Sequence, residues 1–327
     1  MLIGQDGAVT AFDAALAGGR IHHGWLLAGP RGIGKAHFAT LAAHALLTDS
    51  DRIALDPDDA TARRIAEGNE PRLTVVARRV NEKTGKLRVQ IDVEQVRELR
   101  QSLALAAEEG DWRCVVVDAA EEMNRSAANA LLKFLEEPPP RTVIFLVSHA
   151  PGTLLPTLVS RCRRLAFPPL EDGALAEACA LVGATPDAPI LAAARGSVGE
   201  ALSLAAGSGA ALQEALAKVL APLPARIDRP ALHALADLAA GKGEEDAFRA
   251  AGQQLADAAA RLAVAATGAA EAPEGMAHLA GAAAPLAWAE AASDIEAALR
   301  RTAGLNLDRR QALLDMVARL ERAAARP

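Results

Sequence analysis

A glycine-rich segment that ends in one lysine is the part of the sequence best suited to bind phosphate. Residues 29–36 read GPRGIGKA, follow a short apolar run and precede a helical pattern, which is the context that a phosphate-binding loop requires. Gly29, Gly32 and Gly34 would let successive backbone N–H groups turn toward phosphate oxygens, and Lys35 would reach the β- and γ-phosphates. The alternative is a glycine-rich turn that binds no ligand, but the context favours a phosphate loop.

The groups that such a site needs for ATP hydrolysis are incomplete. Ala36 stands where the motif calls for Ser or Thr, whose hydroxyl is a ligand of Mg²⁺. Asp118 ends a run of three valines and would place a carboxylate at the carboxyl end of a buried strand, where the metal is held; the alternative is a residue that caps a turn. The next residue, often a water-orienting glutamate, is Ala119. We expect Glu121 and Glu122 to begin the following helix or to face solvent.

The elements that must position these groups alternate between strands and helices, which predicts a parallel sheet covered on both faces. A segment at 80–91 is expected to form a hairpin with its turn near Thr84 and Gly85, and Asp308 followed by Gln311 predicts a helix start. Apolar runs predict strands at 25–27, 73–77, 114–117 and 143–147, and helical spacing predicts helices at 37–47, 92–107 and 126–135.

The second half of the chain has a different pattern. After residues 167–169, which read FPP, strand patterns disappear; 170–205 predicts a small helical unit and 231–323 is helical throughout. Pro222, Pro224 and Pro230 predict a linker between the two. We therefore expect an α/β domain at 1–168, a small helical domain at 169–222 and a helical domain at 223–327.

Composition excludes several classes of protein. No stretch of 18 apolar residues is free of charge, which excludes a membrane span, and no secretory signal is visible. Three cysteines in 327 residues give neither a disulfide framework nor metal-ligand spacing, which predicts a cytoplasmic protein. A net charge of −6 argues against binding DNA by bulk electrostatics. A local basic face is the alternative, although we favour solvated side chains for its members, Arg78, Arg79, Arg88 and Arg97.

Four segments, in this order, resemble the clamp-loader branch of the AAA+ superfamily, and its bacterial delta′ type most closely. They are IGQD at 3–6, HHGWLLAGPRGIGKA at 22–36, VVVDAAEEMNRSAANALLKFLEEPPPRTVIFLVS at 115–148 and SRC at 160–162. The resemblance is specific over 1–168, weak around Gly196 and Ser197, and returns at 305–311. It implies an AAA+ phosphate-loop domain, then a lid at 169–222 and an oligomerisation collar at 223–327.

The resemblance also implies roles for single residues. Ser148 matches the polar sensor that reads the γ-phosphate, and Ser160, Arg161 and Cys162 match a motif whose arginine reaches the ATP site of the adjacent subunit. Such an arginine finger is worth about 10³ to 10⁵ in rate in other systems. The alternative is a surface arginine in a basic cluster. Two groups of residues in the helix are not expected to do chemistry. The first serves core packing and helix geometry and comprises Asn129, Leu131, Leu132 and Leu135. The second is solvated or interfacial and comprises Lys133 and Glu136.

Two departures from the resembled family bear on cofactors. The stretch 48–72, where relatives often carry a cysteine-rich zinc module, has no cysteine, so we expect no zinc. Glu200 stands where active relatives carry a nucleotide-sensing arginine, and a carboxylate repels a triphosphate. We expect no required cofactor, and weak or absent ATP or ADP binding.

The function implied is that of a non-catalytic subunit of the bacterial DNA polymerase III clamp loader. It would brace tau/gamma-type ATPase subunits and a delta-type subunit, supply Arg161 in trans, and meet the sliding clamp and primer–template DNA through the complex. An active tau/gamma-type ATPase motor is the alternative, and it would need Mg²⁺ held without the hydroxyl. A non-specific DNA-binding protein is a third interpretation, which the acidic balance disfavours.

Overall fold

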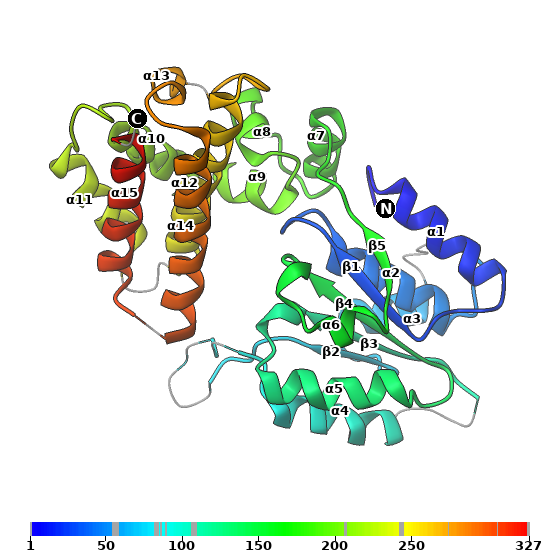
Figure 1. The fold of residues 1–327 in the computed structure, drawn as a ribbon. Helices are drawn as coiled ribbons and strands as arrows, with labels where there is room; N and C mark the ends of the chain where they lie inside the picture. Colours follow the sequence, from blue (N-terminus) through cyan, green and yellow to red (C-terminus); the bar gives the residue numbers. More distant parts are fainter. Residues whose placement is uncertain are drawn as a thin grey trace. The chain divides into compact units, whose positions relative to one another are not determined.

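The computed structural model describes residues 2–53, 59–81, 85, 87–88, 90–105, 110–205, 208–241, 245–273, 275–305 and 307–325. The chain divides into two compact units, Met1–Leu202 and Ser203–Pro327 (Figure 1). The predicted division into three domains stays a prediction, because the lid and the α/β domain lie largely within one compact unit.

A parallel five-stranded sheet forms the centre of the first unit, as predicted, in the order β2-β3-β4-β1-β5. The strands are β1 (Gly24–Ala28), β2 (Leu73–Val76), β3 (Arg113–Asp118), β4 (Thr142–Ser148) and β5 (Arg163–Ala166), and all four neighbouring pairs are parallel. The chain is therefore an α/β protein in this unit. The edge strand β5 was not predicted, because its sequence RRLA exposes two arginines and lacks an apolar run.

Both faces of the sheet are covered by helices (Figure 1). Because successive side chains of a strand point to opposite faces, Trp25 and Leu27 of β1 join one core, while Leu26 and Ala28 join the other. The first core packs against α1 (Asp6–Ala17) and α2 (Lys35–Leu47), and the second against α4 (Val93–Leu105) and α5 (Arg125–Glu136). Two short helices complete the α/β part, α3 (Ala60–Ala66) and α6 (Pro156–Val159).

The details of two predicted segments can be compared with the structure. At 80–91, Val80 and Leu87 form an isolated antiparallel bridge, while Thr84 of the predicted turn lies outside the described residues. On α5, Leu131 and Leu135 are buried as expected, but Asn129 is exposed. The expectation that Asn129 contributes to core packing is therefore wrong, since it lies on the solvent side of this amphipathic helix.

After β5 the described chain is helical. Three helices follow it, α7 (Asp172–Leu181), α8 (Ala188–Ala194) and α9 (Val198–Ala205), and the boundary between the two units falls within α9. Leu170 N–H donates a hydrogen bond to the carbonyl oxygen of Gly196, which joins the turn before α9 to the segment that follows β5.

The second unit is built from six helices in its described part. They surround one apolar core that includes the fully buried Trp288, and none of the helices described along the chain is long and apolar enough to cross a membrane. Asp308 caps the last helix by accepting a 2.7 Å hydrogen bond from Gln311 N–H, which confirms the predicted start. The helices are α10 (Ser208–Leu220), α11 (Arg229–Ala239), α12 (Glu245–Ala266), α13 (Ala277–Ala280), α14 (Pro285–Leu305) and α15 (Arg309–Ala324).

Candidate functional site

The predicted phosphate loop connects β1 to α2, so the strand–loop–helix context is present. Gly32 and Gly34 have φ values of 74° and 94°, in the left-handed region that glycine adopts without a Cβ penalty. Gly29 permits a close backbone approach, since a Cβ there would lie 2.1 Å from the carbonyl oxygen of Phe167. Each glycine of the motif is therefore required by the backbone whether or not a phosphate binds.

The side chain of Lys35 is folded back onto this loop. Its Nζ donates to the carbonyl oxygen of Gly29 at 2.8 Å and to that of Pro30, and the residue is 3% exposed. Burial lowers the pKa of Lys35 to about 8, and the carboxylates of Glu121 and Asp118 partly oppose that effect. The cation that would meet a phosphate is thus buried and satisfied by the protein's own carbonyl groups.

The start of α9 and the turn before it lie directly on the loop. Gly199 N–H donates a 3.0 Å hydrogen bond to the carbonyl oxygen of Gly32, and a Cβ on Gly32 would lie 2.3 Å from the Oγ of Ser197. Ser197 Oγ in turn accepts from Glu200 N–H at 3.1 Å, in the first turn of α9. Residues 196–199 therefore cover one side of the phosphate loop.

The N-terminal segment packs beside the same loop. A Cβ on Gly34 would lie 3.1 Å from Leu2 Cδ1. Gln5 is 2% exposed, and its amide donates to the carbonyl oxygen of Pro168 at 2.9 Å. These contacts place the start of the chain against Gly34 of the loop and against the segment after β5.

Asp118 and Ser148 end the adjacent strands β3 and β4. They lie, with the loop, at the edge of the sheet formed by the carboxyl ends of the strands. Burial raises the pKa of Asp118, which the nearby cations of Arg31 and Lys35 partly offset. Ser148 is fully buried, and its Oγ has no hydrogen-bond partner in the structure. The structure thus gathers the predicted site residues Lys35, Asp118 and Ser148 at one edge.

Glu121 and Glu122 also belong to this edge, and the expectation that they begin the next helix or face solvent is wrong. They form a separate 3₁₀ turn, η1 (Ala120–Glu122), before α5, and both are partly buried. Glu121 Oε1 accepts from His149 N–H at 2.9 Å. Glu122 lies 2.7 Å from Arg78 and 3.6 Å from Arg31 of the loop. Glu122 therefore pairs with Arg31 of the loop, a positive charge that a bound phosphate would use.

These residues do not fit a magnesium-dependent ATP hydrolysis site. Ala36 offers no hydroxyl to a metal, and Ala119 is a buried methyl where a water-orienting carboxylate would stand. Within the described ranges, no group of three or more His, Cys, Asp or Glu side chains could hold a metal ion. This side of the sheet therefore keeps the loop, Lys35 and Asp118, while positions 36 and 119 carry alanine.

Arg161 lies at the opposite edge of the sheet. It lies two residues before β5, and its carbonyl oxygen would be 3.1 Å from a Cβ on Gly24, the first residue of β1. The phosphate loop follows the other end of β1, about 16 Å away at roughly 3.3 Å per residue. Because all strands are parallel, Arg161 and the loop of the same chain lie on opposite edges.

The other residues of the SRC motif shape the backbone around Arg161. Ser160 ends the one-turn helix α6. A Cβ on Gly24 would lie 2.9 Å from Leu135 Cδ2 and 3.2 Å from Cys162 Sγ, so glycine and a small thiol allow α5, β1 and the motif to pack closely. Burial raises the pKa of Cys162 to about 12, which makes it a packing residue rather than a nucleophile.

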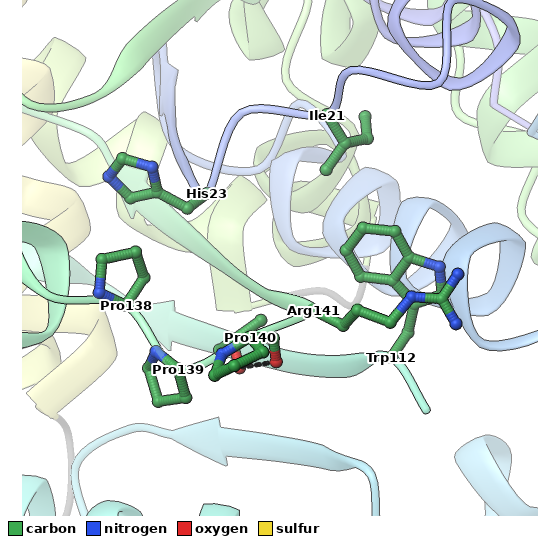
Figure 2. A pocket seen from close by; sticks show the side chains of 8 residues that line it. Ile21, His23, Trp112, Pro138, Pro139, Pro140 and Arg141 are labelled. Atoms are coloured by element: carbon green, nitrogen blue, oxygen red, sulfur yellow. Dashed lines mark hydrogen bonds between the residues drawn. The ribbon is translucent and has the colours of Figure 1, made fainter. Parts of the chain in front are cut away.

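A pocket of about 260 Å³ opens at the same edge as Arg161. Figure 2 shows Trp112 and Arg141 on one side of it and His23 on the other; the Arg141 guanidinium stacks on the Trp112 ring at 5.2 Å. None of the lining side chains offers a nucleophile beside a base. They are Ile21, His23, Trp112, Pro138, Pro139, Pro140, Arg141 and Thr142.

The arginines considered for a basic face each have an acidic partner. Besides the pair between Arg78 and Glu122, three contacts of 2.5 to 3.4 Å involve more exposed side chains, so these arginines are paired rather than simply solvated. They are Arg79 with Glu98, Arg88 with Asp92, and Arg97 with Glu94. This part of the surface is therefore largely neutralised.

Comparison with known proteins gives consistent similarities. The sequence model of the family described as "DNA polymerase III, delta subunit" matches residues 4–171. The chain is 40% identical to DNA polymerase III subunit delta′ of Pseudomonas aeruginosa over 194 residues, which is 58% of this chain and 55% of that protein. It is 31% identical to the Bacillus subtilis delta′ subunit over 186 residues, 57% and 54% of the two chains. It is also 32% identical to the Escherichia coli tau subunit over 163 residues, 49% of this chain and 24% of tau. The chain spans about half the length of the curated delta′ relatives it matches.

Proposed function

The chain belongs to the DNA polymerase III delta subunit family, and on this premise we propose that it is a non-catalytic, delta′-type subunit of a bacterial clamp loader. In this role it braces ATPase subunits and supplies Arg161 to the nucleotide site of one of them while a sliding clamp is loaded onto primed DNA. The observation that carries the proposal is that Arg161 and the phosphate loop lie on opposite edges of one sheet. An arginine in that place is too far from the loop of its own chain to contact a phosphate there, which supports a role at the nucleotide site of another chain.

The chemistry of a finger supplied in trans is electrostatic. A guanidinium offers five N–H donors in a fixed fork and stays charged at any physiological pH. Placed on the oxygens of a transferring phosphoryl group, it stabilises the charge that develops there. The side chain of Arg161 is 37% exposed, so it lies at the surface, where a neighbouring subunit could contact it.

The state of the loop supports the non-catalytic half of the proposal. Ala36 and Ala119 remove a metal ligand and a water-orienting carboxylate, Lys35 donates to loop carbonyls, and Gly199 hydrogen-bonds to the loop. We propose that ATP and ADP bind weakly or not at all, and that no cofactor is required.

The proposed partners are tau/gamma-type ATPase subunits and a delta-type subunit, with the sliding clamp and primer–template DNA met through the complex. Residues 223–327, in the helical second unit, would serve as the oligomerisation collar, and the protein would act in the cytoplasm. No zinc is proposed for the segment at 48–72. In its described part a buried Glu70 pairs with Arg64 and Arg72, at 2.8 Å each, and these pairs hold the segment in place.

Three measurements test the proposal. The purified chain with Mg²⁺ and ATP should show no hydrolysis above background, and calorimetric titration with ADP and ATP should show little or no heat. In the reconstituted loader, Arg161→Ala should keep the assembly intact while ATP hydrolysis falls. Turnover by the isolated chain would overturn the non-catalytic role, and unchanged hydrolysis with Arg161→Ala would overturn the finger.

An active motor of the tau/gamma type is the second candidate. Its support is the retained Lys35 and the similarity to tau. Robust magnesium-dependent turnover by the isolated chain would decide in its favour.

A further inference from the structure

The guanidinium of Arg161 does not extend freely from the surface but folds back over its own chain. Its Nη1 donates a 3.0 Å hydrogen bond to the carbonyl oxygen of Thr157, four residues earlier in α6. Its Nη2 lies 2.9 Å from Oε1 of Glu136, at the end of α5. Both terminal nitrogens, the ones that would fork onto phosphate oxygens, therefore contact acceptors of the same chain.

A carboxylate and a phosphate compete for the same donors. Both accept charge-assisted hydrogen bonds from the guanidinium fork, so Arg161 binds one of them fully only by loosening its contact with the other. Glu136 is 49% exposed, which leaves this ion pair accessible to solvent and to a partner. The sequence predicts only that Glu136 is solvated or interfacial, because no pattern in it relates position 136 to position 161.

We propose that Glu136 is a positioning residue for Arg161, holding the guanidinium against α6 until the nucleotide phosphate of an adjacent subunit takes its place. This inference rests on the proposed function and deepens it, since it names the contact that Arg161 breaks when it binds a nucleotide phosphate. The Thr157 carbonyl is a neutral backbone acceptor and keeps the side chain against α6. The charged partner, Glu136, sets the balance between the resting and the engaged finger.

The size of the effect follows from the exposure of the pair. Exposed ion pairs change an equilibrium by a factor of about 1.5 to 5. Removing the Glu136 charge should therefore shift the finger toward the phosphate by a similar factor. The shift is small enough to be reversed by phosphate binding and large enough to be measured as a rate.

The test is steady-state ATP hydrolysis by the reconstituted loader that carries Glu136→Gln in this chain. The amide keeps the size of the side chain and one oxygen acceptor but loses the charge. We expect the rate at saturating ATP to rise about 1.5- to fivefold, with little change in KM. Glu137→Gln is the matched control, since Glu137 is the exposed adjacent glutamate; its rate should equal that of the wild type.

A double variant separates positioning from a general structural role. In the Arg161→Ala background, Glu136→Gln should have no further effect, whereas damage to α5 would lower the rate in both backgrounds. An unchanged or lower rate for Glu136→Gln beside a clear loss for Arg161→Ala overturns the inference alone. If Arg161→Ala itself changes nothing, the proposed function is overturned together with it.

The resting contact can also be measured in the isolated chain. The ¹⁵N-labelled guanidinium signal of Arg161 should shift on Glu136→Gln and stay in place on Glu137→Gln. Equal spectra for the wild type and Glu136→Gln would overturn the resting ion pair, whatever the loader assay shows.

Discussion

The backbone N–H of Gly199 donates a 3.0 Å hydrogen bond to the carbonyl oxygen of Gly32, which joins the first turn of α9 to the centre of the phosphate loop. The two residues are 167 positions apart, and both are glycines at a point where two segments of the chain approach closely. This contact and the buried Lys35 make the loop a part of the packed structure. The loop's conformation therefore contributes to stability without any ligand.

The first prediction follows from that contact. Gly32→Ala should lower the free energy of unfolding by about 1–3 kcal/mol, because it places a side chain at a positive φ and its Cβ would meet Ser197 Oγ at 2.3 Å. Urea unfolding measures the change. Gly173→Ala in α7 is the control, since its Cβ meets nothing within 4 Å, and it should be neutral or stabilising by up to about 1 kcal/mol. Equal stability of the two variants would contradict the covered loop.

A second prediction concerns the missing chemical groups. The double variant Ala36→Thr and Ala119→Glu returns a hydroxyl and a carboxylate to the positions where active phosphate-loop ATPases carry them. We expect ATP turnover by the isolated chain to stay at background, since Ser197 and Gly199 still cover the loop. Turnover by this variant would show that the two alanines alone account for the loss.

The third prediction concerns the reactivity of the thiols. Burial raises the pKa of Cys162 to about 12 and also raises those of Cys114 and Cys179. The thiolate is the reactive form, so iodoacetamide at pH 8 should label the native chain far more slowly than the same chain in guanidinium chloride. Rapid labelling of Cys162 in the native chain would contradict its packing between Gly24 and α5.

The pH dependence of stability provides a fourth prediction. Burial by itself would raise the pKa of Glu70, but hydrogen bonds from Arg72 and Arg64 outweigh it and hold the pKa below the ordinary 4.5. A carboxyl group with a lowered pKa stabilises the folded state above its unfolded pKa, and this contribution is lost as the pH falls through the folded value.

Glu70→Gln should therefore cost about 1–3 kcal/mol at neutral pH and flatten the loss of stability below pH 4.5. Glu67→Gln, at an exposed position after α3, should leave the urea midpoint and its pH dependence unchanged. A parallel acid profile for wild type and Glu70→Gln would contradict the buried network.

The sequence predicts the parts of this fold that depend on local patterns. Buried apolar runs predicted four of the five strands, and helical spacing predicted α2, α4 and α5, because each of these patterns lies within a short segment. The strand β5 was missed since its pairing with β1 decides its conformation more than its own residues do. Asn129 was misplaced because the periodicity of a helix does not show which polar residue borders the core.

For the site, too, some features can be predicted from the sequence and others cannot. Glycine spacing and the absence of a hydroxyl at position 36 are legible in the sequence, and they predicted a phosphate cradle without metal chemistry. The contacts between Gly32 and Gly199, between Arg31 and Glu122, and between Arg161 and Glu136 join residues far apart in the chain. Only the packing of the sheet brings them together, so composition and spacing hold no signal for them.

The central claim is that this chain contributes an arginine to a neighbour's site rather than a site of its own. Steady-state ATP hydrolysis by the reconstituted loader with Arg161→Ala in this subunit tests it most directly. The account predicts an intact assembly whose rate falls by at least the share of the one site that receives the finger. It also predicts that Arg161→Lys, which keeps the charge but loses the planar fork, does not fully restore the rate. A wild-type rate with Arg161→Ala would contradict the account.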